Sequence, residues 1–134
     1  MRKIYQDIFE NEIEDGNCLQ ACVASLLDLD LEEVPHFSSY GELWYQKFVD
    51  WGLKRGFYVL TIDSMPPPEV YAIMGGPSPR GGCSHAVISG PNNEIVHDPH
   101  PEGGGLAPGP RWCYLFIPVS PEVKETCDKE KELV

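Results

Sequence analysis

The chain has 134 residues, 42% of them apolar, and a formal net charge of −11. This length fits one domain, and the apolar fraction is sufficient for one hydrophobic core. So acidic a protein repels a phosphate backbone, which argues against nucleic acid as a partner and favours a neutral or cationic substrate.

The number of cysteines and the hydropathy of the chain suggest in which cellular compartment the protein is found. Five cysteines are an odd number, so they cannot all pair in a closed disulfide framework. The first residues do not form the apolar run of a signal peptide, and no stretch approaches the ~18 apolar residues of a membrane span. We therefore expect a cytoplasmic protein with reduced cysteines and no membrane partner.

The N-terminal third predicts a buried helix. Residues 1–16 are polar and acidic, which predicts an extended lead-in. Residues 18–29 are nearly all apolar, which is typical of a central helix buried on all sides. Asn17 is the expected N-cap of this helix, and Pro35 prevents helix beyond it.

A second helix is predicted over residues 39–55. Ser39 and Glu42 have the spacing of a capping box at its start. Gly56 is the expected stop. The helical stripe is expected to pack in the core and contains Leu43, Trp44, Lys47, Phe48 and Trp51.

The rest of the chain predicts strands. Residues rich in β-formers lie at 57–62, 71–74, 84–88, 94–98 and 112–119. The second of these runs is expected to end at Gly75-Gly76-Pro77. A turn at Pro91-Asn92-Asn93 predicts that the third and fourth form a hairpin.

The order of these elements predicts the fold class. Two helices followed by several strands favour an α+β fold with an antiparallel sheet. We expect one domain over residues 1–120, with a loop rich in Gly and Pro at 99–110. Residues 121–134 are predicted to be a charged tail.

Cys18 stands where a turn meets the first helix. A thiol attacks a carbonyl carbon as the thiolate, which the positive end of a helix stabilises. The unpaired N–H groups there can also bind a developing oxyanion. Cys22, one turn further on among apolar neighbours, is predicted to be inert packing.

A base and its orienting acid are predicted from the hairpin. His85 lies near the start of one strand, and Asp98 ends the strand expected to pair with it. We expect Asp98 to accept a hydrogen bond from Nδ1 of His85, which would hold the tautomer and stabilise the imidazolium.

These residues form an ordered set of motifs. Gly16-Asn17-Cys18 opens the apolar helix, His85-Ala86-Val87-Ile88 follows on a strand, and His97-Asp98-Pro99 comes last. Over residues 6 to 118 the set resembles papain-like cysteine peptidases, most closely the compact C39-like domains of bacteria and phages. The resemblance implies a papain-like fold with a central N-terminal helix packed on an antiparallel sheet.

The resemblance also implies a catalytic site without a cofactor. Cys18 is implied as nucleophile, His85 as base and Asp98 as orienting acid. The family uses an upstream Gln as an oxyanion donor, and Gln6 is the only Gln that precedes Cys18. Gln6 can serve if residues 7–16 loop out. Gln20 lies on another side of the helix and is a poor substitute.

Other interpretations of these residues remain open. A zinc site built from Cys83, His85, His97, Asp98, His100 and Cys113 is a rival, although the spacing matches no common zinc motif. His97 is expected to be exposed or structural. The same fold can also serve as a binding or inhibitor module, or carry out acyl transfer or deamidation.

The favoured hypothesis is a cysteine hydrolase that cleaves an amide, isopeptide or related acyl bond. Its expected partner is a peptide, a protein or a small amide. No metal is expected. The sequence does not indicate the oligomeric state.

Overall fold

A computed structural model describes residues 1–9 and 16–120 as an α+β fold, with two helices packed on a five-stranded antiparallel sheet. The helices are α1 (Cys18–Leu27) and α2 (Trp44–Lys54), and short 3-10 segments span Leu31–Glu33, Phe37–Leu43 and Pro91–Asn93. The strands are β1 (Phe57–Ile62), β2 (Ala72–Pro77), β3 (Ser84–Ser89), β4 (Ile95–His97) and β5 (Trp112–Pro118). The predicted fold class is confirmed.

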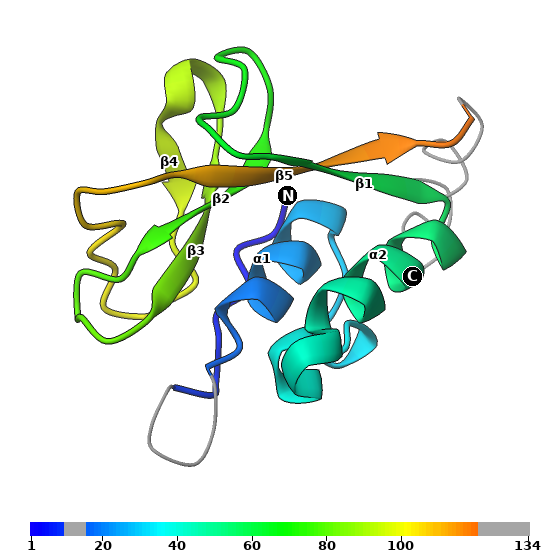
Figure 1. The fold of residues 1–134 in the computed structure, drawn as a ribbon, viewed down its shortest axis with the longest axis horizontal. Helices are drawn as coiled ribbons and strands as arrows, with labels where there is room; N and C mark the ends of the chain where they lie inside the picture. Colours follow the sequence, from blue (N-terminus) through cyan, green and yellow to red (C-terminus); the bar gives the residue numbers. More distant parts are fainter. Residues whose placement is uncertain (10–15, 121–134) are drawn as a thin grey trace.

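The sheet has the strand order β1-β5-β2-β3-β4, with every neighbouring pair antiparallel. The last strand along the chain therefore lies between β1 and β2. Both helices lie on the same side of the sheet (Figure 1), with α1 against β2 and β3 and α2 against β1. This arrangement brings the start of α1 to the β3 side of the molecule.

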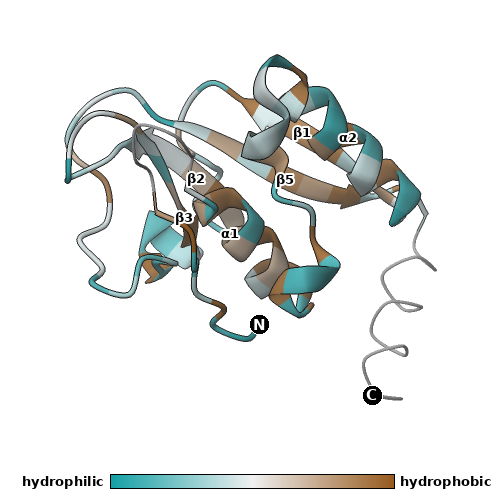
Figure 2. Cartoon of the chain, turned by 90° about the horizontal axis from the view of Figure 1, so that it is seen from below, coloured by the Kyte–Doolittle hydropathy of each residue, from teal (hydrophilic) through white to brown (hydrophobic). Residues whose placement is uncertain are grey.

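Helix α1 is the buried central helix that the apolar run predicts. Every residue from Leu19 to Ser25 is buried. Figure 2 shows the helix beside β2 and β3, with apolar and polar colours along it. The helix ends at Leu27, earlier than expected, because Asp28 has a left-handed conformation with φ 56°. The backbone N–H of Asp28 caps the carbonyls of Ala24 and Ser25.

The core continues from α1 into α2 and the sheet. Val23 and Cys22 of α1 pack with Phe48 of α2, and all three are fully buried. The predicted stripe is only partly in the core, because Leu43 is 58% exposed. Within residues 1–9 and 16–120, no helix has the length and apolar character needed to cross a membrane.

Asn17 is the N-cap residue of α1, as predicted, although its side chain binds elsewhere. Its side chain makes no capping hydrogen bond. Its Oδ1 instead accepts from the backbone N–H groups of Asp7 at 3.1 Å and Ile8 at 2.8 Å, while Nδ2 donates to the carboxylate of Asp7 and to Gln20. Asp7 and Ile8 lie outside the helix, in the N-terminal segment, so Asn17 joins that segment to α1.

The second predicted helix is divided. Gly41 has φ 60° and ψ −128°, which kinks the 3-10 segment Phe37–Leu43 in its interior, and α2 begins only at Trp44. Ser39 does not cap this helix; its hydroxyl donates to the carbonyl of His36 at 2.6 Å. The capping box expected from Ser39 and Glu42 is therefore wrong.

Strand β2 extends past the predicted stop and includes Gly75 and Gly76. A Cβ on Gly75 would overlap the indole of Trp112, and one on Gly76 would lie 2.8 Å from the guanidinium of Arg111. The two glycines therefore provide room for the large side chains of Trp112, in β5, and of Arg111, directly before it. This constraint arises only in the folded sheet.

The predicted hairpin is confirmed. Strands β3 and β4 pair antiparallel, with Ile88 opposite His97. Asp98 directly follows β4 and lies near His85, the second residue of β3. The predicted tail at 121–134 lies outside the described residues.

We predict that Asn17→Ala will destabilise the protein by about 2–3 kcal/mol, because several buried hydrogen bonds are lost at once. Urea denaturation measures the change. Gln46→Ala, at an exposed position of α2, is the control and should change stability by less than about 0.5 kcal/mol. Equal stability of the two variants would contradict the role given to Asn17.

Candidate active site

Cys18 is the first residue of α1, and its side chain is partly exposed. The first hydrogen bond of the helix runs from the N–H of Ala21 to the carbonyl of Asn17 at 3.1 Å. The amides that precede Ala21 have no carbonyl within the helix to bind. The thiol therefore lies beside backbone donors and the positive end of the helix dipole.

The structure brings His85 and Asp98 into direct contact. Nε2 of His85 lies 2.8 Å from Oδ1 of Asp98, and both side chains are largely buried. The sequence predicted that Asp98 would bind Nδ1, and that detail is wrong. Asp98 follows β4 on the Nε2 side of the ring, which leaves Nδ1 for another partner.

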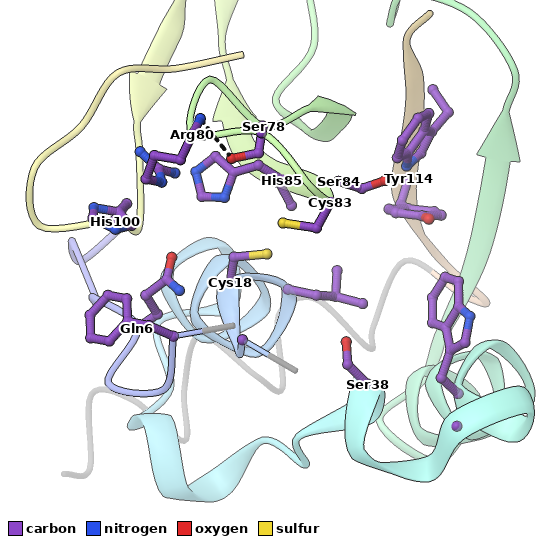
Figure 3. A pocket seen from close by; sticks show the side chains of 18 residues that line it. Gln6, Cys18, Ser38, Ser78, Arg80, Cys83, Ser84, His85, His100 and Tyr114 are labelled. Carbon is purple, nitrogen blue, oxygen red and sulfur yellow. Dashed lines mark hydrogen bonds between the residues drawn. The ribbon is translucent and has the colours of Figure 1, made fainter. Parts of the chain in front are cut away.

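Cys18 is the side chain placed to be that partner, since it lines the same pocket as His85 and contributes to the raised pKa of the imidazole. Because Nε2 binds Asp98, Nδ1 is the ring nitrogen that remains for the thiol. Figure 3 shows the thiol of Cys18 below the ring of His85. The thiol, the imidazole and the carboxylate thus form a continuous chain of three groups.

Asp98 is held by more than the histidine. Its Oδ1 also accepts from the backbone N–H of His100 at 2.9 Å, and its Oδ2 accepts from that of Gly105 at 2.8 Å. Burial alone would raise the pKa of Asp98, but the hydrogen bonds from His85, His100 and Gly105 outweigh it and lower that pKa below 3.8. Asp98 is therefore ionised at neutral pH.

The charge of Asp98 acts on His85. Burial alone would lower the pKa of His85, but its hydrogen bond to Asp98 and the neighbouring thiol of Cys18 raise that pKa to about 9. The imidazole therefore carries a proton at neutral pH. A positive charge consequently lies next to the sulfur of Cys18.

Gln6 lines the same pocket as Cys18 and is buried. Its backbone N–H donates to the carbonyl of Pro99 at 3.0 Å, and its Nε2 donates to that of Ile8 at 3.0 Å. Nε2 carries two hydrogens, so one remains. Buried Oε1 has no hydrogen-bond partner among the described residues. The role of Gln6 as oxyanion donor stays a prediction.

A backbone contact explains how Gln6 reaches the site from 12 residues upstream of Cys18. Ile8 and Asn17 are bound together, because the backbone N–H of Asn17 donates to the carbonyl of Ile8 at 3.1 Å. Ile8 therefore lies beside Asn17, which brings the preceding residues, Gln6 among them, next to the start of α1. Gln20 is occupied elsewhere, since its Nε2 donates to the carbonyls of Leu31 and Val34.

The site opens into a pocket of about 930 Å³. Sequence reasoning did not identify most of its walls. Figure 3 shows two ends, one next to Tyr114 and one next to Arg80 and His100. At the first end the ring of Trp44 lies edge to face against that of Tyr114, with centroids 6.4 Å apart. Leu19 and Trp112 also line the pocket. No sequence motif marks these residues, although aromatic residues on neighbouring elements are a weak signal of a lined cavity.

The rival metal site is not assembled. In the described part of the chain, no group of three or more His, Cys, Asp or Glu side chains is placed to hold a metal ion. His97 is structural and buried, with Nε2 2.7 Å from the carbonyl of Ile4 and its ring against Tyr5. Cys113 is also fully buried.

No family model, curated protein or solved structure matches this chain. The fold and the site nevertheless define a class: an α+β protein with a thiol, an imidazole and a carboxylate aligned in an open pocket. Such a chain of groups can support nucleophilic chemistry at sulfur.

We predict that Asp98→Asn will lower the pKa of His85 from about 9 towards its ordinary value of 6.5, because the carboxylate partner is lost. A pH titration of imidazole resonances by NMR measures this shift, with His85→Gln to assign the signal. Asp63→Asn, an exposed carboxylate, is the matched control and should leave the titration unchanged. A wild-type midpoint near 6.5 would contradict the geometry.

Proposed function

We propose that this protein is a papain-like cysteine hydrolase that cleaves an amide, isopeptide or related acyl bond. The observation that carries the proposal is the aligned set of Cys18, His85 and Asp98, with a 2.8 Å contact between the histidine and the carboxylate. The nucleophile lies at the start of a buried helix and faces an open pocket.

The first half of the proposed reaction forms a thioester. The thiolate of Cys18, paired with the imidazolium of His85, attacks the carbonyl carbon, and a C–S bond forms as the carbonyl oxygen becomes an oxyanion. The backbone N–H groups at the start of α1 and the remaining N–H of Gln6 stabilise this charge. When the tetrahedral intermediate collapses, the C–N bond breaks and His85 transfers its proton to the leaving amine.

The second half releases the acyl group. Neutral His85 takes a proton from water, whose oxygen attacks the thioester carbonyl. The C–S bond then breaks, and the carboxylic acid leaves while Cys18 and His85 return to their starting state. Asp98 orients the ring throughout and stabilises each imidazolium. If an amine or hydroxyl replaces water, the same steps give acyl transfer, and a side-chain amide as substrate gives deamidation.

A papain-like relationship and a reducing, cytoplasmic location belong to the same proposal. The support for the relationship is the chain order of the three groups, with the cysteine at the start of a central helix and the histidine on a later strand. The support for the location is chemical, because a sulfur nucleophile must stay reduced to act.

A binding or inhibitor module is the alternative use of the same pocket. Such a module needs the cavity but no activated thiol, so the reactivity of Cys18 separates the two functions. Cys22 provides an internal reference one turn away. Burial raises the pKa of Cys22 well above 9.0, with a smaller contribution from Cys18, so this thiol stays neutral.

We predict that iodoacetamide will label Cys18 and leave Cys22 unlabelled at neutral pH, as read from peptide masses. His85→Ala should slow the labelling of Cys18 by about tenfold or more, because the neighbouring imidazolium is lost. Cys18→Ala should abolish turnover and keep the fold.

Cys22→Ser is the matched control. Cys18 should remain as reactive in this variant as in the wild-type protein. The variant should be less stable, because a polar hydroxyl replaces a thiol at a fully buried position. Equal labelling of the two thiols in the wild-type protein, or a rate at Cys18 that is unaffected by His85→Ala, would support the binding module instead.

The pH dependence of amide hydrolysis follows from His85. Formation of the thioester needs the protonated ring, and its raised pKa keeps the proton in place up to about pH 9. We predict that kcat/KM, measured with a fluorogenic amide from a peptide library, will decrease as the pH rises through about 9. Asp98→Asn should move this decrease to lower pH. A decrease that is unmoved in the variant would contradict the proposed role of the carboxylate.

A further inference from the structure

The charge of the pocket differs from that of the whole chain. The formal net charge is −11, with 21 acidic residues against 10 Lys and Arg. Among the described residues that line the pocket there is no Asp or Glu, and Arg80 supplies a permanent positive charge. An acidic protein therefore has a pocket wall whose fixed charge has the opposite sign.

Arg80 is held at this wall by its backbone and by one of its side-chain nitrogens. Its backbone N–H donates to the hydroxyl of buried Ser78 at 3.2 Å, and its Nη1 donates to the carbonyl of Gly103 at 2.9 Å. A guanidinium has five N–H groups, so most remain for a ligand. Arg80 forms no ion pair with any acidic residue of the described chain.

His100 lies next to Arg80 and belongs to the same end of the pocket. Burial lowers the pKa of His100, and the positive charge of Arg80 lowers it further. The ring of His100 is also 6.4 Å from that of His85, edge to face. Figure 3 shows Arg80 and His100 together beside His85, at the opposite end from Tyr114.

This placement assigns the two ends of the pocket to two parts of a substrate. In the proposed reaction, His85 protonates the leaving amine, so the leaving group must lie on the His85 side of Cys18. Arg80 and His100 are on that side. The acyl part then extends the other way, towards the aromatic end at Trp44 and Tyr114.

We propose that Arg80 is a specificity-determining residue that binds a carboxylate on the leaving group. The proposal rests on the hydrolase function proposed above. It implies amide substrates whose leaving amine also carries a carboxylate, such as a C-terminal amino acid. A guanidinium matches a carboxylate with two parallel N–H bonds, which favours this ligand geometrically as well as electrostatically.

A pair of alkylating reagents tests the charge of this end without any substrate. Iodoacetate and iodoacetamide transfer similar groups, because in each case sulfur displaces iodide, but only iodoacetate carries a carboxylate. The rate constant of iodoacetate at Cys18 is divided by that of iodoacetamide, each read from the mass of the Cys18 peptide. This ratio should be about fivefold lower in Arg80→Gln than in the wild-type protein. Added salt should lower the wild-type ratio as well.

Arg111→Gln is the matched control. Arg111 donates to the carbonyls of Ala107 and Gly109 and does not line the pocket. This variant should keep the wild-type ratio. An equal ratio in wild type and Arg80→Gln, or an equal fall in both variants, would overturn the assignment of Arg80.

A substrate pair tests the specificity directly. N-acetyl-phenylalanyl dipeptides are offered as free acids and as the matching C-terminal amides. We expect the wild-type protein to cleave the free acids about fivefold faster, and Arg80→Gln to lose this preference. Equal rates for acids and amides in the wild-type protein would overturn the proposed carboxylate recognition.

The two proposals fail in different ways. If Cys18 reacts only as an ordinary thiol and cleaves neither peptide, the hydrolase proposal fails. The alkylation ratio can then still be measured at alkaline pH, where any accessible thiol reacts and Arg80 remains charged. An unchanged ratio under those conditions would overturn the assignment of Arg80 separately.

Discussion

The burial of α1 (Cys18–Leu27) against β2 and β3 is the constraint on which the rest of the structure depends. The helix is buried from Leu19 to Ser25, so it cannot rotate or shift without exposing apolar surface. Its first residue is thereby fixed opposite the start of β3, where His85 lies. The same packing that stabilises the core also sets the position of the thiol. A change in the core would therefore alter the geometry of the site.

Asp98 has a second structural role beside the orientation of the histidine. Through His85, His100 and Gly105 it joins β3 to the loop that follows β4. Arg80 adds a further connection, because it donates to the carbonyl of Gly103 in that same loop. The carboxylate is thus bound on several sides, which keeps its charge in place and explains the direction of both pKa changes. The hydrogen bonds of Asp98 that connect β3 to this loop are therefore the same ones that set the charges of Asp98 and His85.

The pocket wall differs in charge from the rest of the chain, and this difference affects which ligands it can bind. Although the chain is strongly acidic, the described wall of the cavity is formed by aromatic, small and basic side chains. An acidic surface repels anions over the Debye length, whereas a local guanidinium attracts them at contact distance. Such a combination would favour ligands whose negative charge is small and placed at one end. This description fits an amide with a single carboxylate better than a polyanion.

The sequence by itself determined the elements and the identities of the reactive groups. Continuous apolar residues predicted α1, β-forming residues predicted the strands, and the turn at 91–93 predicted the β3–β4 hairpin, because these signals depend on local periodicity. That hairpin also made the contact between His85 and Asp98 predictable. Only the tertiary structure decided the partners of Asn17, the extension of β2 through Gly75, and the approach of Gln6 and Arg80 to the site. Each of these depends on contacts between segments far apart in the chain, and a local pattern of residues carries no information about which distant groups will compete for a hydrogen bond or fill a space.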